Sequence, residues 1–206
     1  LPVAAAVVAG VAIRAGHVLP RDFPLNDGGL FFAMVRDLQQ AHYRLPAFTS
    51  YNAARIPFAY SPLGFYLAGW LQDLTGMRLV DAFRWIPLVA SCLTVPAFAP
   101  PARELIRSRT ALVAAVVAFG LLPRSFLWLI MGGGLTRAPG FLFAILALHQ
   151  LALLYRRRRA RYVVTLALFA ALTALSHLGT TPFLAFSAGL FFLALGRHRF
   201  GARWSA

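Results

Sequence analysis

Apolar runs too long for a globular core constrain this chain more than any other feature. They lie at about residues 82–102, 110–130, 138–155, 161–177 and 181–196. A helix that crosses a bilayer needs roughly 20 mostly apolar residues, and these runs reach or approach that length. Of all residues, 60% are hydrophobic and 13% charged, against about 45–50% and about 25% in a soluble domain. The sequence therefore predicts one all-α domain, a polytopic bundle of transmembrane helices.

The chain begins inside a further apolar stretch. Residues 1–13 are apolar, start without methionine and are followed by Arg14. We interpret them as the end of a first membrane span, and the chain as a fragment of a longer protein. A cleaved signal peptide is the alternative, but its positively charged leading region is absent.

Arginines indicate the orientation in the membrane. The net charge is +14, and all 20 basic residues are arginine. The connections 103–109 and 156–161 and the tail from Arg197 are rich in arginine, whereas the connections 131–137 and 176–181 between them carry one and none. By the positive-inside rule, we expect a multi-pass protein of the cell membrane with its arginine-rich loops in the cytoplasm. No basic stripe is interleaved with base-stacking aromatics, so no nucleic-acid partner is expected.

The long polar stretch at residues 14–56 is expected to be an external loop. Within it, Asn26-Asp27 opens a helical pattern. The apolar face of this pattern comprises Leu30, Phe31, Met34, Leu38 and Ala41. Charged and amide side chains occupy the opposite face, which predicts an amphipathic helix on the membrane surface.

Residues 57–74 decide on which side of the membrane that loop lies. The segment is apolar and aromatic but barely long enough to cross, and Pro57 and Pro62 leave backbone acceptors without helical donors. A full crossing would place residues 14–56 in the cytoplasm. We favour an interfacial or re-entrant helix, which places them outside, because such backbone is tolerated at an interface or around a cavity.

Taken in chain order, these features resemble the amino-terminal part of GT-C-type membrane glycosyltransferases, which are protein mannosyltransferase-like enzymes that use polyprenyl-phosphate-linked sugars. They also resemble GT-C-like membrane proteins of unknown activity. The stretches that carry the resemblance are Asn26–Gly29 after a first span, the aromatic–proline segment Tyr60–Leu67, the basic turn Arg103–Arg109, and Gly132–Arg137 and Ser176-His177 at outer helix ends. The segment Tyr60–Leu67 is similar to the family pattern Y-P-P-L-x-x-Y-L, with a serine in place of the first proline.

The resemblance implies a base near the acceptor hydroxyl and a cation near the phosphate leaving group. The family's loop aspartate falls on Asp27, the expected catalytic residue, although capping of a helix explains Asn26 or Asp27 equally well. Arg137, beside three consecutive glycines, and Arg124, inside a predicted span, are the candidates for the donor phosphate. Arginines that snorkel from helix ends are the alternative.

Five further polar side chains are site candidates, namely Asn26, Ser176, His177, Tyr60 and Tyr66. A helix-end cap for His177 and an interfacial aromatic belt for the tyrosines are the alternatives. No second histidine or carboxylate lies at ligand spacing beside His177, so no metal site or cofactor is predicted. Whether the protein uses a divalent cation stays an open question.

Three functions remain open from the sequence. The first is transfer of a sugar from a polyprenyl-phosphate donor to an extracytoplasmic acceptor, with the bilayer and the lipid-linked sugar as partners. The second is a transporter or flippase, a class that often has broken helices and internal repeats; no repeat is visible here. The third is a non-catalytic membrane subunit.

Overall fold

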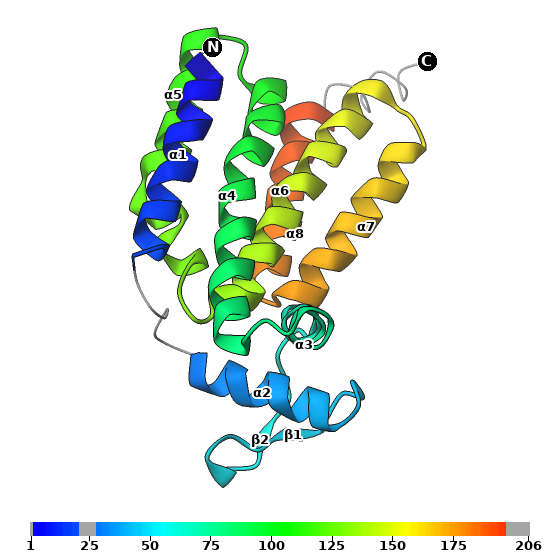
Figure 1. The fold of residues 1–206 in the computed structure, drawn as a ribbon. Coiled ribbons are helices and arrows are strands. Elements are labelled where there is room, and N and C mark those ends of the chain that lie inside the picture. Colours follow the sequence, from blue (N-terminus) through cyan, green and yellow to red (C-terminus); the bar gives the residue numbers. More distant parts are fainter. Residues whose placement is uncertain (1, 21–27, 197–206) are drawn as a thin grey trace.

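The computed structural model describes residues 2–20 and 28–196, and this part of the chain is almost entirely helical (Figure 1). Its α-helices are α1 (Pro2–Val18), α2 (Gly28–Gln40), α3 (Leu63–Thr75), α4 (Leu79–Leu105), α5 (Arg109–Leu121), α6 (Gly134–Arg157), α7 (Arg161–Ser176) and α8 (Thr180–Phe191). Short 3₁₀ turns are η1 (Tyr51–Ala53), η2 (Pro123–Ser125) and η3 (Leu127–Leu129), and a π turn, η4 (Phe192–Gly196), follows α8. The strands β1 (Phe48–Thr49) and β2 (Ile56–Pro57) pair antiparallel. The prediction of an all-α chain is confirmed.

The helices form a bundle with two others laid across one end. α1, α4, α5, α6, α7 and α8 run side by side, and α2 and α3 lie beneath them (Figure 1). α1 packs on α4 and α5, whereas α6 packs on α4, α7 and α8. The arginine-rich connections α4–α5 and α6–α7 lie at the other end of the bundle, away from α2 and α3 (Figure 1).

Two helices, α4 and α6, are long and apolar enough to cross a membrane. α5 passes the same test only together with the turns that follow it, across a bend of 74°. The helices α1, α7 and α8 are apolar but shorter. These lengths indicate a membrane protein, while the predicted spans at residues 161–177 and 181–196 stay predictions.

The helix of the predicted span at 110–130 is broken in the structure. α5 ends at Leu121, and Leu122 is extended because the ring of Pro123 disfavours helical geometry in the residue before it. Arg124 therefore lies in η2, in an exposed turn, and not inside a span as expected.

The polar stretch does not begin at Arg14, because α1 continues through this residue to Val18. The Arg14 side chain is fully buried, at 0% exposure. Its guanidinium donates to the carbonyl oxygens of Gly10 (3.1 Å) and Gly120 (2.6 Å) and lies 4.8 Å from the ring centroid of Phe126. Carbonyl dipoles and an aromatic face thus replace water around the buried charge.

The predicted apolar face of α2 forms, but protein covers it. Phe31, Met34 and Leu38 are buried, together with Val35. They share one core cluster with side chains of α3 and α4 and with Leu135 of α6. The helix therefore packs on the end of the bundle, and its apolar face is not free to lie on lipid as the periodicity suggested.

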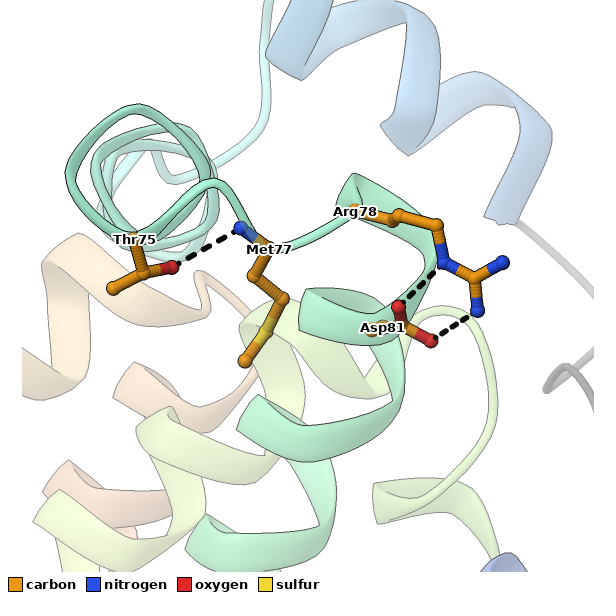
Figure 2. Close-up of polar contacts among 4 residues, drawn as sticks. All are labelled: Thr75, Met77, Arg78 and Asp81. Carbon is orange, nitrogen blue, oxygen red and sulfur yellow. Dashed lines mark hydrogen bonds and ion pairs between the residues drawn. The ribbon is translucent and has the colours of Figure 1, made fainter.

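A tight turn joins α3 to α4 (Figure 2). α3 ends at Thr75 and is capped by Gly76, whose φ of 72° lies in the left-handed region that glycine adopts most readily. The backbone N–H of Met77 then donates to Thr75 Oγ1 (3.2 Å). At the start of α4, Arg78 donates to both carboxylate oxygens of Asp81, at 2.7 and 3.0 Å. This ion pair is solvated, so it fixes the turn's geometry more than it adds stability.

A substitution at Gly64 can test how closely α3 packs on α6. A Cβ atom at Gly64 would lie 2.5 Å from the carbonyl oxygen of Leu135. Because that atom belongs to the backbone, Gly64→Ala should push the helices apart and lower the free energy of unfolding by about 1–3 kcal/mol, measured by denaturant unfolding in detergent. The matched control is Gly189→Ala in α8, where a Cβ meets no atom within 4 Å. Equal stability of the two variants would contradict the close contact.

Candidate functional site

A cavity of about 280 Å³ is lined by residues that precede α3 and by residues of the α7–α8 turn. Three segments line it. They are residues 59–61 after β2, Thr136 in the first turn of α6, and residues 176–179 between α7 and α8. The cavity therefore joins the long loop to the polar helix ends.

Asp37 holds the hairpin that precedes the first of these segments. Its carboxylate accepts hydrogen bonds from Thr49 Oγ1 (2.7 Å), Ser50 N (2.8 Å) and Ser50 Oγ (2.6 Å). Burial raises the pKa of Asp37, but the hydrogen bonds from Ser50 and Thr49 outweigh it and leave the pKa below its usual value. Because β1 pairs with β2, this anchor on α2 also positions the residues that follow β2.

Residues 60 and 61 contact two helices, α7 and α2. Ser61 Oγ donates to the carbonyl oxygen of Ala174 in α7 (2.8 Å). The ring of Tyr60 meets Phe31 of α2 edge-on, with centroids 5.0 Å apart, and is 43% exposed. The first turn of α2 is therefore close to the cavity wall, and the Tyr60 side chain remains accessible.

His177 directly follows the last residue of α7, in extended backbone that turns the chain toward α8. Its Nδ1 lies 2.8 Å from Thr180 Oγ1, and within the described chain Nε2 has no hydrogen-bond partner. A Cβ at Gly140 of α6 would lie 2.8 Å from the His177 Cβ. Only glycine at position 140 lets this histidine pack so closely on α6.

The surroundings of the His177 imidazole disfavour its charged form. Burial lowers its pKa, and the positive charge of Arg137 lowers it further. A neutral ring offers one donor and one acceptor nitrogen. If Thr180 accepts from Nδ1, Nε2 is an acceptor available to a hydroxyl group in the cavity.

Arg137 adjoins the cavity without lining it. It follows Thr136 in α6, and its Nη1 donates to the carbonyl oxygen of Trp128 (2.9 Å). The guanidinium also lies over the Trp128 ring, 5.4 Å from its centroid. Since arginine has five N–H donors, several remain for a ligand.

The structure brings three predicted site residues, Tyr60, Ser176 and His177, into one cavity. Tyr66 is not among them; its hydroxyl donates to the Tyr43 carbonyl (2.9 Å), and the two rings stack. Arg124 lies apart as well, in its exposed turn. The predicted catalytic Asp27 and its neighbour Asn26 lie outside the described residues.

Two polar residues of the cavity, Thr136 and Ser61, were not predicted as site residues from the sequence. Thr136 is buried, at 1% exposure, and its hydroxyl donates to the Gly133 carbonyl (3.3 Å). Its position next to Arg137 and the place of Ser61 in the aromatic–proline segment were the available signals. Within residues 2–20 and 28–196, no three His, Cys, Asp or Glu side chains gather as metal ligands.

Comparison of the chain with protein-family models, with curated proteins and with solved structures finds no match. The function is therefore argued from the site itself.

The influence of Arg137 on His177 can be measured directly. Arg137→Gln removes a positive charge that disfavours the imidazolium, so the pKa of His177 should rise. Titration of the imidazole signals by NMR in detergent follows this pKa. Arg124→Gln is the matched control, with the same loss of charge outside the cavity, and should leave the His177 titration unchanged. Identical titration curves for the two variants would show that Arg137 does not act on His177.

Proposed function

We propose that the chain is the membrane-embedded part of a GT-C-type glycosyltransferase, with its site at the cavity of Tyr60, Thr136, Ser176 and His177. One observation carries the proposal. Tyr60 lines the same cavity as Ser176 and His177, which are more than 100 residues further along the chain, and all three were predicted from the sequence as site residues.

The location of the cavity supports a lipid-linked substrate. It lies at the end of the bundle opposite the arginine-rich connections 103–109 and 156–161 (Figure 1). With those connections in the cytoplasm, the cavity opens at the outer membrane surface. There a substrate can keep its polyprenyl tail in the bilayer while its phosphate and sugar reach the cavity.

The long loop lies on the same side in this arrangement. α3 lies across the end of the bundle and does not run along it (Figure 1). Residues 28–61 are therefore at the cavity end, which supports the interfacial interpretation of residues 57–74. Asp27 directly precedes α2, whose first turn contacts Tyr60 through Phe31, which supports a role for Asp27 at the cavity.

We assign each side chain one role in the transfer. Asp27 takes the proton of the acceptor hydroxyl as that oxygen attacks the anomeric carbon, and the bond from this carbon to the donor phosphate oxygen breaks. Arg137 offsets the charge on the departing phosphate. The neutral His177 and the hydroxyl of Tyr60 hold the sugar or the acceptor by hydrogen bonds.

The assignment predicts the behaviour of full-length variants in membranes. Asp27→Asn should lower sugar transfer by at least about 100-fold, the usual loss on removal of a general base. Arg137→Gln should lower it as well, because the phosphate loses its cation. The polyprenyl-phosphate-linked sugar of the host should then accumulate, measured by hydrolysis and chromatography of extracted lipids.

Arg124→Gln is the matched control and should transfer as well as the unaltered protein. Undiminished transfer in folded Asp27→Asn and Arg137→Gln proteins would overturn the proposal.

A transport function is the second candidate, and the bent pair formed by α5 and the turns η2 and η3 favours it. Discontinuous helices line the sites of many transporters, and here the chain bends by 74° at the break. Sealed vesicles with purified protein separate the two functions. A transporter moves lipid-linked sugar across the bilayer with its phosphate bond intact, whereas a transferase breaks that bond.

A further inference from the structure

A second cavity, of about 510 Å³, lies at the opposite end of the bundle. Its polar lining consists of Arg103, Arg107, Ser108 and Arg109, and its apolar lining of Pro2, Val3, Ile106 and Leu112. These residues come from the start of α1, the end of α4 and the start of α5. Positive charge and apolar surface therefore meet in one hollow.

The three arginines of this cavity have no acidic partner in the described chain. Glu104, between them in the sequence, pairs instead with Arg156 of α6, with Nε and Oε2 2.9 Å apart. Within residues 2–20 and 28–196, no hydrogen bond or ion pair engages the side chain of Arg103, Arg107 or Arg109. Like charges so close together repel one another, and an anion in the cavity relieves that repulsion.

The start of α5 adds to the positive potential. Ser108 is the N-cap of α5, and its hydroxyl oxygen accepts from the backbone N–H of Ala111 (3.4 Å). The first turn of a helix carries free N–H groups and the positive end of the helix dipole, which favour a phosphate group. Arg109 is the first residue of that turn.

The depth of the cavity matches the headgroup layer of a bilayer. α4 has 27 residues, a length of about 40 Å, whereas the hydrocarbon core is about 30 Å thick. Its last turn, which contains Arg103, then reaches the polar layer. The apolar wall of Val3 and Leu112 continues from there toward the hydrocarbon.

We propose that this cavity binds the phosphate of an anionic membrane lipid. The guanidinium groups of Arg103, Arg107 and Arg109 contact the phosphate, and the apolar wall contacts the beginning of an acyl chain. The positive-inside rule explains arginines in these loops, but it does not explain why three of them surround a hollow with an apolar wall. A basic pocket between helices on the cytoplasmic side is a known setting for lipid headgroups. This site is independent of glycosyl transfer.

Lipid retention tests the proposal. The purified chain is held in detergent with equal amounts of phosphatidylglycerol and phosphatidylcholine, and native mass spectrometry counts the lipids that stay bound. The unaltered protein should retain phosphatidylglycerol in preference. The triple variant Arg103→Gln/Arg107→Gln/Arg109→Gln should bind it more weakly, by about fivefold for each arginine removed.

The matched control is Arg157→Gln/Arg158→Gln/Arg159→Gln, which removes the same charge from the same end but lies outside the cavity. It should retain phosphatidylglycerol as the unaltered protein does. Equal losses in both triple variants would show a general surface-charge effect and overturn the cavity site. The single variant Arg107→Gln serves in place of the first triple variant if the latter unfolds, and it should show the fivefold loss alone.

Inorganic phosphate separates a lipid from a free anion. Because the apolar wall contributes to binding, millimolar inorganic phosphate should not displace phosphatidylglycerol from the unaltered protein. Displacement by inorganic phosphate would show a free-phosphate site and overturn the assignment to a lipid.

Discussion

The close packing of neighbouring segments on the first two turns of α6 is the contact on which the rest of the structure depends. The backbone of Leu135 leaves no room for a side chain at Gly64 of α3, and His177 leaves none at Gly140 of α6. The first contact seats α3 against the bundle, and the second brings the α7–α8 turn to α6. The cavity forms between these segments, so a side chain at either glycine would separate its walls.

Polar groups in the described chain concentrate at the two ends of the bundle, and each end has a different chemistry. One end carries hydroxyl groups, the His177 imidazole and a nearby arginine. The other carries unpaired arginines around a partly apolar hollow. Arg14 is a buried charge near the end of α1, and carbonyl oxygens of α1 and α5 accept its hydrogen bonds. A buried charge is costly unless such groups replace water, and these hydrogen bonds also tie α1 to α5.

Residue patterns predict the parts of this structure that depend on local order. The period of Phe31, Met34 and Leu38 predicts the buried face of α2, and polar residues at helix ends predict Ser176 and His177 as site candidates. What covers the face of α2 is a tertiary property, because the partners on α3 and α4 are distant in sequence. The spacing of apolar residues in α2 therefore suggested contact with lipid, whereas side chains of α3 and α4 cover this face in the structure.

Other features depend on partners that a local pattern does not contain. An arginine after an apolar run looks like the start of a loop, yet Arg14 is buried because Gly120 and Ser125 accept its hydrogen bonds. Pro123 was a local signal for the break after α5, but the hydropathy of the whole run concealed it. Asp27 lies outside the described residues, so its role at the cavity stays a prediction.

The ligands proposed for both cavities depend on which end of the bundle faces the cytoplasm. Cys92 is the single cysteine, so Cys92→Ser gives a background without cysteine. In this background, Gln40→Cys reports on the end of the bundle that carries α2. Arg159→Cys reports on the arginine-rich end. A membrane-impermeant maleimide should label Gln40→Cys in intact cells, and Arg159→Cys only after the membrane is opened. Labelling of both positions from the same side, or in the reverse order, would contradict the account.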